Sequence, residues 1–374
     1  MQAPEADSQT MISQQSTVIL VGASVRAAAQ SAARAGISVI GMDLFGDRET
    51  IRACQQHYCL GQEAVNRITK DSELASIPIL QVGGLSKESG SLLTKLPNRW
   101  LSAPPSDQVR FSDPEFLSEL AASSDSIFPE TTTTAPTTTE AGRWLQKSKS
   151  GCGGLAVGWH ASDPPSADRY FQRWMPGRVY GASFISSGND NGARLLGICR
   201  GHFTRIGIRP FVYSGSSGPY RLAADVESKI QKLGNQFVAR TGLVGVFNVD
   251  VLVRNGQVVL LEVNPRWSGS MELIELDPAN KRIVPEQESI LGEVLSGKKF
   301  KCPNQTNRGS FYKRIVFARQ RTKIDPSELE QLSTDERQLT DLPMDTVVVE
   351  RGQPVCTVLF RMPAKGLRQI RSLI

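Results

Sequence analysis

Oxygen-bearing side chains gather in one stretch near the middle of the chain, where Asp250, Glu262 and Asn264 stand among alternating apolar residues. Two carboxylates and an amide oxygen suit a hard cation such as Mg²⁺, or Mn²⁺, that keeps water and phosphate oxygens in its shell. Arg266 and the small run 268–270 follow directly, and they would supply a guanidinium and close backbone N–H groups for an oxyanion. An exposed hairpin face would carry the same residue types, so the chemistry depends on how these side chains are positioned.

The stretch predicts a β-hairpin, because apolar and polar residues alternate on both sides of Asn255-Gly256. A two-residue turn at this dipeptide would pair Asp250 with Leu261 and put the two carboxylates on opposite faces. A three-residue loop over 254–256 pairs Asp250 with Leu260 instead, and the three oxygen ligands then share one face. We therefore expect the longer loop, with these residues on the buried face: Val249, Val251, Val259, Leu261 and Val263.

A second chemical pattern is the glycine-rich stretch WLQKSKSGCGG, which begins at Trp144. We expect a short strand that delivers Lys147, followed by a loop in which Gly151, Gly153 and Gly154 let backbone N–H groups approach a triphosphate. The loop is not of the Walker A type, which would end in Gly-Lys and Ser or Thr before a helix. Taken alone, the stretch also fits a flexible β-turn.

Together the two patterns resemble the ATP-grasp ligases. The resemblance is carried by GLVGVFNVD, which ends at Asp250, by the spacing D-x11-E-x-N-P-R, and by WLQK at a similar distance before them. It extends from about Thr17 to Phe360 and is greatest to stand-alone predicted carboxylate-amine ligases, some of which resemble enzymes for methanopterin- and methanofuran-type C1 carriers. It implies an α/β ATP-grasp fold with an N-terminal Rossmann-like domain, a mobile lid and a catalytic antiparallel sheet.

The resemblance also implies ATP and Mg²⁺ as cofactors, with Mn²⁺ able to replace the metal. It implies that the metal ligands are Asp250, Glu262 and Asn264, and that the substrate contacts are Ser268, Gly269 and Ser270. The catalytic residues that it implies are Lys147, Asn264 and Arg266. Those that it implies for nucleotide binding are Lys147, Lys149, Gly153, Gly154, Gln172, Arg173, Trp174 and Met175.

Two positions depart from the pattern of these ligases. They usually have Pro after the lid lysine, where this chain has Ser148, so Lys149 could share or take over the phosphate contact. Val179 stands where many relatives have an acid for the ribose, which leaves ribose recognition open. Trp174 and Met175 would either flank the adenine ring or pack between two lobes.

The activity implied is formation of an amide bond between a small-molecule carboxylate and an amine through an acyl phosphate, in C1-carrier biosynthesis, with a homodimer as a compatible assembly. Carboxylation by bicarbonate, phosphoryl transfer without ligation and a non-catalytic nucleotide sensor are the alternatives within the fold. Gly22 and Asp43 would also fit a dinucleotide-binding unit, but GASVRA lacks the full G-x-G-x-x-G pattern. His202 is a candidate acid or base, although ATP-grasp chemistry requires none.

The chain is expected to contain five segments: a disordered tail over 1–16, an N-terminal α/β domain over 17–110, a lid with a Thr-rich loop over 111–200, a catalytic subdomain over 201–300 and a β-rich element over 301–374. Strands over 17–21 and 38–42 around a helix over 25–35 predict a parallel sheet. Further helices are expected over 92–96 and 222–241.

The composition is that of an ordinary enzyme, with 40% hydrophobic and 21% charged residues and a mild net charge of +6. No basic run with interleaved aromatic residues favours nucleic acid, and the six cysteines with three histidines show no zinc spacing. No signal peptide is recognised, and no apolar run approaches the roughly 20 residues that a membrane span needs. We therefore expect a cytoplasmic protein without a nucleic-acid or membrane partner.

Overall fold

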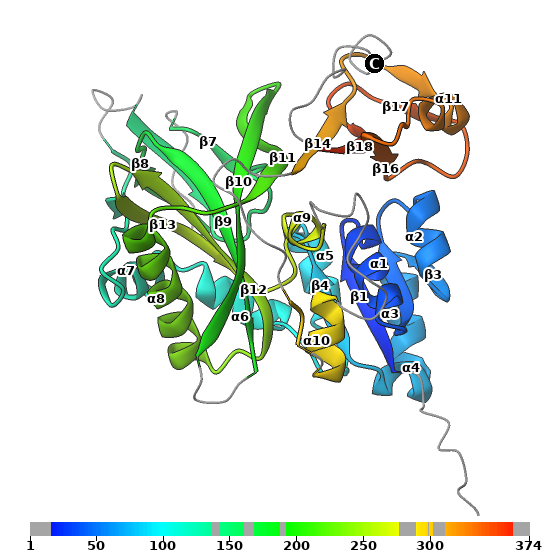
Figure 1. The fold of residues 1–374 in the computed structure, drawn as a ribbon, viewed down its shortest axis with the longest axis horizontal. Helices are drawn as coiled ribbons and strands as arrows, with labels where there is room; N and C mark the ends of the chain where they lie inside the picture. Colours follow the sequence, from blue (N-terminus) through cyan, green and yellow to red (C-terminus); the bar gives the residue numbers. More distant parts are fainter. Residues whose placement is uncertain are drawn as a thin grey trace, which may run out of the picture.

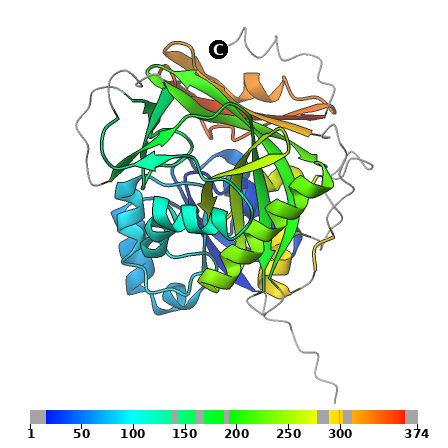
Figure 2. The same ribbon diagram turned by 90° about the vertical axis from the view of Figure 1, so that its left-hand side faces the viewer.

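The computed structural model describes residues 16–136, 143–160, 168–187, 192–276, 289–297, 299–301 and 311–361. Of the tail predicted over 1–16, only Ser16 is among the described residues, and the predicted 301–374 element is described only in part. Figure 1 shows an N-terminal α/β domain beside a large sheet, with the C-terminal elements and a small sheet at one end of the molecule. Figure 2 shows the same C-terminal strands across the top of the molecule.

The N-terminal domain is built on a parallel sheet in the order β3-β2-β1-β4, as the βαβ pattern predicts. Alternate residues of β1 enter two different cores, because Val18 and Leu20 point to one face while Ile19 and Val21 point to the other. The elements are β1 (Thr17–Gly22), α1 (Arg26–Arg34), β2 (Ser38–Asp43), α2 (Arg48–Ala53), β3 (Gln56–Cys59), α3 (Gln62–Lys70), α4 (Ser72–Ser76), β4 (Ile79–Val82) and α5 (Lys87–Leu93).

The helix predicted over 92–96 is wrong, because α5 begins five residues earlier and ends at Leu93. Its start is fixed by Ser86, whose side chain accepts a hydrogen bond from the Ser89 N–H group and so caps the first turn. The prediction placed the helix on its apolar residues alone and missed this capping position. The difference matters because α5 forms one wall of the candidate site described below.

A small antiparallel sheet, here called the lid sheet, follows two short helices in the order β5-β8-β6-β7. Its strands are β5 (Thr131–Thr132), β6 (Trp144–Ser148), β7 (Val157–Trp159) and β8 (Arg169–Arg173), and the helices before it are α6 (Pro105–Phe111) and α7 (Pro114–Ala122). Residues 174–177 connect the lid sheet to the first strand of the large sheet.

The large sheet is antiparallel, and its strand order is β13-β12-β9-β10-β11-β14-β18-β16. The helix α8 (Ala224–Thr241) covers one face, where Ile230, Leu233 and Phe237 are fully buried in the same core as Phe184 and Phe247. The strands are β9 (Arg178–Ser186), β10 (Ala193–Ile206), β11 (Arg209–Tyr220), β12 (Gly245–Arg254), β13 (Gln257–Asn264), β14 (Phe311–Phe317), β16 (Arg337–Thr340) and β18 (Pro354–Arg361). The remaining elements are α9 (Met271–Ile274), α10 (Ile290–Ser296), β15 (Thr322–Ile324), α11 (Pro326–Glu330) and β17 (Val347–Val349).

The hairpin of β12 and β13 differs from its predicted register. Arg254 pairs with Gln257, and Asn255 and Gly256 both have positive φ, so the turn has two residues rather than three. The register then shifts between Asp250 and Val251, and Leu261 is the extra residue of a β-bulge. The bulge brings the two carboxylates opposite each other in spite of the short turn. It also puts Leu260, not Leu261, into the core beside Val249 and Val251.

The segment after β13 joins the N-terminal sheet. Trp267 forms a parallel bridge with Val82, and its N–H group donates to the Gln81 carbonyl oxygen over 3.1 Å. The indole is 1% exposed and lies in the core shared by both domains. Because Trp267 lies one residue beyond Arg266, this junction fixes the segment after β13 against the N-terminal domain.

No helix among the described residues is long and apolar enough to cross a membrane.

Candidate active site

Asp250 and Glu262 lie opposite each other on neighbouring strands, and Asn264 joins their carboxylates. The Asn264 Nδ2 atom donates to Asp250 Oδ2 over 2.9 Å and to Glu262 Oε1 over 3.1 Å. The Asn248 Nδ2 atom donates to the other Asp250 oxygen over 2.7 Å. The structure therefore brings the three predicted metal ligands to one face, as their types suggested, and adds Asn248 as a partner that the sequence interpretation missed.

This pair of carboxylates is electrostatically unfavourable without a cation. Burial and the neighbouring Glu262 charge raise the pKa of Asp250 well above its ordinary value. Burial also opposes the charge of Glu262, but the Lys147 ammonium and the hydrogen bonds from Asp250 and Asn264 lower the pKa of Glu262. The pKa shifts of the two carboxyl groups are thus opposite in direction, and Asp250 is the one whose charge is disfavoured while no cation is bound.

The oxygen ligands at this site suit Mg²⁺, which shares its coordination shell with water and phosphate, better than a metal whose ligands all come from the protein. No group of three or more His, Cys, Asp and Glu side chains that could hold a metal is found in the described part of the chain. Two carboxylates, with an amide oxygen that accepts from Arg266 in this structure, leave most of an octahedral shell to water and phosphate, which is the usual way in which Mg²⁺ is bound beside nucleotides. Asp250 and Glu262 are buried carboxylates of like charge that need a cation, and this also favours Mg²⁺.

Lys147 is the buried cation of the site. Its Nζ atom donates to Gln172 Oε1 over 3.2 Å and lies 5.7 Å from the centre of the Tyr170 ring. Burial works against its charge, yet the pKa of Lys147 is raised because the Tyr170 hydroxyl and the Glu262 carboxylate favour the ammonium form. Lys149, the other predicted phosphate contact, instead pairs with Asp113 over 2.6 Å.

The glycine-rich loop after β6 bridges two parts of the molecule. The Gly153 carbonyl accepts a hydrogen bond from the Tyr213 N–H group of β11 over 2.9 Å. A Cβ atom on Gly154 would lie 1.8 Å from the Phe211 carbonyl oxygen, and one on Gly84 would lie 2.2 Å from the Cys152 Cβ atom. The loop therefore rests on β11 at one end and on the N-terminal domain at the other.

Arg266 is held between the hairpin and the N-terminal domain. Its Nε atom donates to the Gly83 carbonyl oxygen over 2.6 Å, and its Nη1 atom donates to Asn264 Oδ1. The Gly83 carbonyl also accepts from Gln81 Nε2 over 3.3 Å. The guanidinium is consequently fixed in orientation before any ligand binds, which is what recognition of a developing oxyanion requires.

The segment 268–270 is linked to β14 of the large sheet through a buried network of charged side chains. Lys313 Nζ donates to the Gly269 carbonyl oxygen over 3.3 Å and to Glu272 Oε2 over 2.7 Å. Arg26 Nη1 donates to Glu272 Oε1 over 2.6 Å, and Arg26 Nε donates to Asp341 Oδ1 over 2.6 Å. The network connects α1, the segment that follows β13, and strand β14. It therefore holds the N-terminal domain and the large sheet together next to residues 268–270.

Sequence interpretation missed this network, although its signal was present. Arg26 belongs to the stretch GASVRA that follows the first strand, and it is 1% exposed. A buried arginine demands carboxylate partners. Those partners lie at Glu272 and Asp341, more than 240 residues away, so no local pattern identifies them.

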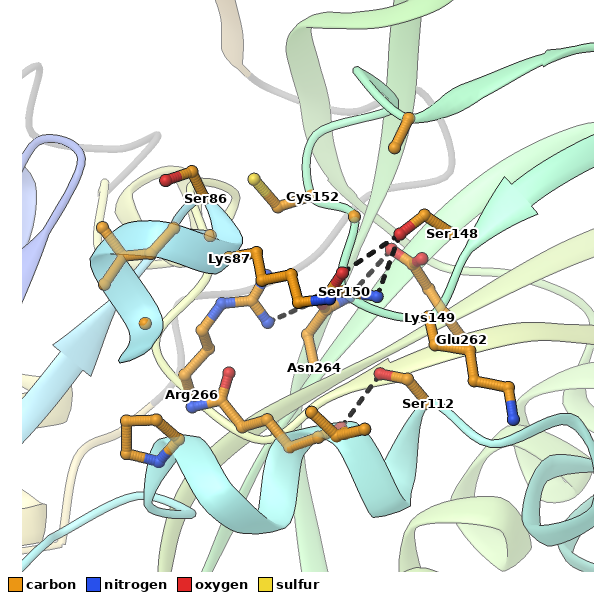
Figure 3. Close-up of a pocket in the computed structure, with 18 of the residues that line it drawn as sticks. Ser86, Lys87, Ser112, Ser148, Lys149, Ser150, Cys152, Glu262, Asn264 and Arg266 are labelled. Carbon is orange, nitrogen blue, oxygen red and sulfur yellow. Dashed lines mark hydrogen bonds between the residues drawn. The ribbon is translucent and has the colours of Figure 1, made fainter. Parts of the chain in front are cut away.

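A pocket of about 330 Å³ opens between the lid sheet, the end of β13 and helices α5 and α6 (Figure 3). Of the predicted site residues, its lining includes Lys147, Lys149, Gly154, Glu262, Asn264 and Arg266. Figure 3 shows Ser86, Lys87 and Arg266 toward one side of this pocket and Ser148, Lys149 and Glu262 toward the other, with Asn264 between them. The two predicted patterns, hairpin and glycine-rich loop, thus converge on one cavity.

The other predicted residues lie around this pocket rather than in its lining. Gln172 is buried against Lys147, and Asp250 lies opposite Glu262 on the neighbouring strand. The Arg173 guanidinium stacks over the Trp144 ring at 4.4 Å and pairs with Glu130. These remaining predicted residues are also outside the lining: Gly153, Arg173, Trp174, Met175, Ser268, Gly269 and Ser270.

Trp174 and Met175 lie in the connection between the lid sheet and β9. Trp174 is 41% exposed, and its ring centre lies 5.9 Å from that of Trp159 at the end of β7. The Trp159 ring in turn packs on Phe211 of β11 at 5.4 Å. The Trp174 ring is therefore part of a contact between the lid sheet and the large sheet.

Asp43 is not available for a nucleotide ribose. Its buried carboxylate accepts hydrogen bonds from the N–H groups of Val25 and Gly46 and pairs with His57 Nε2 over 2.9 Å. A Cβ atom on Gly22 would lie 1.9 Å from the Val82 carbonyl oxygen, so this glycine permits the close approach of β1 and β4. Both residues have structural roles, which removes the basis for a dinucleotide site.

His202 is also structural. Its Nε2 atom lies 2.8 Å from the Ser217 hydroxyl, its ring stacks on Tyr312, and it is absent from the pocket lining. Burial and the nearby Arg200 and Arg314 charges lower the pKa of His202 to about 4, so the ring is neutral at pH 7.

We therefore expect His202→Gln to leave turnover within about threefold of the wild-type rate, because the ring neither reaches the pocket nor changes charge near pH 7. The pH dependence of turnover should also be unchanged between pH 6 and 8. A loss of about 100-fold, of the size that removal of a general base produces, would contradict this assignment.

The parallel N-terminal sheet, the antiparallel lid sheet and the large antiparallel sheet with its paired carboxylates define the ATP-grasp fold. Residues 116–270 match the model of the ATP-grasp domain.

The uncharacterized protein MJ0776 of Methanocaldococcus jannaschii is 23% identical over 196 residues, which cover 52% of this chain and 43% of that protein. The carbamoyl phosphate synthase large chain of Neisseria meningitidis serogroup A is 32% identical over 94 residues, which cover 24% of this chain and 8% of that protein. The chain thus spans less than half the length of these curated relatives. An ADP complex of N5-carboxyaminoimidazole ribonucleotide synthetase superposes with a TM-score of 0.66 at 12% identity, over 96% of both chains.

Proposed function

We propose that this protein is an ATP- and Mg²⁺-dependent ligase that joins a carboxylate to an amine through an acyl phosphate. The observation that carries the proposal is that four polar side chains line one pocket: Lys147, Glu262, Asn264 and Arg266. Asp250 lies opposite Glu262 on the neighbouring strand. The ATP-grasp domain match and the likeness to an enzyme described with bound ADP support nucleotide binding. The C1-carrier pathway, a cytoplasmic location and a homodimer stay predictions within this proposal.

The metal would be held by Asp250, Glu262 and Asn264, and Mg²⁺ bound there neutralises negative charge on a transferring phosphoryl group. Lys147 would hold a phosphate oxygen of ATP from the lid side, since its buried ammonium faces the same carboxylates. A substrate carboxylate then attacks the γ-phosphorus, ADP leaves, and an acyl phosphate forms. The amine attacks the acyl carbon next, phosphate departs, and the amine loses a proton to water.

Arg266 would act in the second half of this reaction. Its guanidinium is fixed by Gly83 and Asn264 at the edge of the pocket, where it can stabilise both the departing phosphate and the tetrahedral oxyanion. Enclosure beneath the lid sheet would protect the acyl phosphate from water. Holding both reactants in one pocket supplies effective concentrations on the order of 10⁵ M or more.

The experiment that tests the proposal measures ADP release from Mg²⁺-ATP across a panel of amino acids crossed with amines, with bicarbonate as a separate arm. We expect release to require one acid and one amine, and we expect a condensed product by mass spectrometry. A protein that binds ATP but releases no ADP with any combination would instead be a nucleotide sensor.

A second candidate is the ATP-dependent carboxylation of a nitrogen by bicarbonate. It is favoured by the likeness over 96% of both chains to N5-carboxyaminoimidazole ribonucleotide synthetase, although 12% identity reports on the fold alone. ADP release that needs bicarbonate and an amine, but no other acid, would select this reaction over the ligase.

The lid loop gives a further prediction within this function. In Gly154→Ala the new methyl group would meet the Phe211 carbonyl, and φ at this position is +73°, so the loop cannot rest on β11 as it does now. Strain of about 1–3 kcal/mol should weaken ATP binding by roughly tenfold or more. Isothermal titration with ATP measures this change.

The matched control is Gly158→Ala, because a Cβ atom on Gly158 meets nothing within 4 Å and its backbone does not adopt the left-handed region. It lies in β7 of the same lid sheet. Equal ATP affinities for the two variants would mean that the contact between the loop and β11 does not contribute to nucleotide binding.

A further inference from the structure

The pocket has two walls of different chemistry. The catalytic wall carries Lys147, Glu262, Asn264 and Arg266. The opposite wall, here called the α5–α6 wall, comes from the N-terminal domain and is rich in hydroxyl groups. Its polar lining residues are Gln81, Ser86, Lys87, Ser91, Thr94, Ser106, Gln108 and Ser112.

Charge on the α5–α6 wall is of one sign. Lys87 is its cation, while Glu262 is the only carboxylate residue among the described lining residues and belongs to the catalytic wall. Within the described chain Lys87 makes no hydrogen bond and no ion pair, in contrast to Lys149, which is paired with Asp113. The adjacent Glu88 is fully exposed and does not line the pocket. Figure 3 shows the Lys87 side chain extended from α5 into the pocket.

Aromatic surface is nearly absent from this pocket. Tyr170 is the only aromatic residue among the described lining residues, and its ring lies beside the Lys147 ammonium on the lid side. A volume of about 330 Å³ is at the low end for small-molecule sites. The lining thus offers no stacking platform to an aromatic substrate, but it does offer the Lys87 ammonium to an oxyanion. The hydroxyl groups of Ser86, Thr94 and Ser112 already donate within the wall.

We propose that the amine substrate bound against the α5–α6 wall is small and non-aromatic and carries a carboxylate or phosphate group that Lys87 holds. This inference rests on the proposed ligase function, since it names the class of amine that the reaction would use. The anionic group takes no part in the chemistry. It orients the amine so that its nitrogen faces the acyl phosphate.

The test compares amines of similar length and different charge, with binding followed by saturation-transfer NMR in the presence of Mg²⁺ and a non-hydrolysable ATP analogue. The probes are β-alanine with a carboxylate, O-phosphoethanolamine with a phosphate, and ethanolamine and tyramine with neither. We expect one or both of the amines with an anionic group to bind, and the two amines without one not to bind. Which anionic amine binds distinguishes a carboxylate from a phosphate.

Lys87→Gln should weaken binding of the anionic amine by about tenfold, the effect of losing one charge-assisted contact. Lys87→Arg should retain most of the affinity. Lys70→Gln is the matched control, because Lys70 is an exposed lysine of the same domain that does not line the pocket.

Ethanolamine or tyramine binding as tightly as the anionic amines would overturn the proposal, as would unchanged affinity in Lys87→Gln or no binding of either anionic amine. Because binding is measured without turnover, a failure of the Lys87 proposal can be distinguished from a failure of the ligase assignment. Binding that depends on Lys87, in a protein that never forms ADP, would overturn the ligase assignment and leave the anion-binding wall in place.

Discussion

Glu262→Gln is expected to lower the rate of ADP formation by a factor of about 100 or more, since it removes a charge from the site that would hold Mg²⁺. Asp250→Asn should have a similar effect, because the two carboxylates face each other and act on the same cation. Steady-state turnover at saturating Mg²⁺-ATP measures both. Near-normal turnover in the two variants would rule out the metal assignment.

A stability measurement separates a metal site from a merely structural pair. Burial and like charge already raise the pKa of Asp250, so the pair destabilises the protein when no cation is bound. Asp250→Asn should therefore leave the melting temperature of the metal-free protein unchanged or higher, while it abolishes the stabilisation that Mg²⁺-ATP gives. A structural pair would give the reverse result, a lower melting temperature without ligand. Glu63→Gln, at an exposed position of α3, is the matched control.

Arg26→Met is expected to destabilise the folded protein by about 3 kcal/mol, because it leaves Glu272 and Asp341 without their shared guanidinium. Lys313 still contacts Glu272, which keeps the loss at the lower end for a broken buried pair. Urea unfolding at pH 7 measures the change. Arg48→Met is the matched control, since its ion pair with the exposed Glu330 should contribute less than about 1 kcal/mol.

The pH dependence of this difference follows from Glu272. Burial opposes its charge, but Arg26 and Lys313 lower the pKa of Glu272 from 4.5 to about 2. A carboxylate whose pKa is lower in the folded state contributes stability that is complete above about pH 4.5 and is lost as the pH falls toward 2. The gap between wild type and Arg26→Met should therefore narrow over this range. A gap that stays constant down to pH 2 would show that Arg26 acts without Glu272.

The sequence predicted the fold well where local patterns carry the information. Buried runs such as 17–22 and 38–43, separated by a helix, indicate a parallel sheet, because strands covered on both faces are continuously apolar. The hairpin was harder. Its alternation pattern and its turn dipeptide favoured different registers, and the chain satisfies both through the bulge at Leu261, which no single local rule predicts.

The reacting groups of the candidate site could be predicted from the sequence, but the residues that hold them in position could not. Asp250, Glu262, Asn264 and Arg266 stand within one hairpin, so their spacing alone suggests a shared face. The contacts that hold them come from distant parts of the chain, such as Gly83 on Arg266 and Lys313 on Gly269. The α5–α6 wall was missed for the same reason, since Lys87 becomes significant only when α5 is placed against the hairpin.

The central claim is that ATP activates a carboxylate as an acyl phosphate, and transfer of an oxygen label tests it most directly. The protein would be incubated with Mg²⁺-ATP, the amine and an acid labelled with ¹⁸O in its carboxylate, and the phosphate products would be examined by ³¹P NMR. We predict ADP and inorganic phosphate that carries one ¹⁸O atom from the acid, because the carboxylate oxygen bonds to the γ-phosphorus. Unlabelled phosphate, or formation of AMP, would contradict the account.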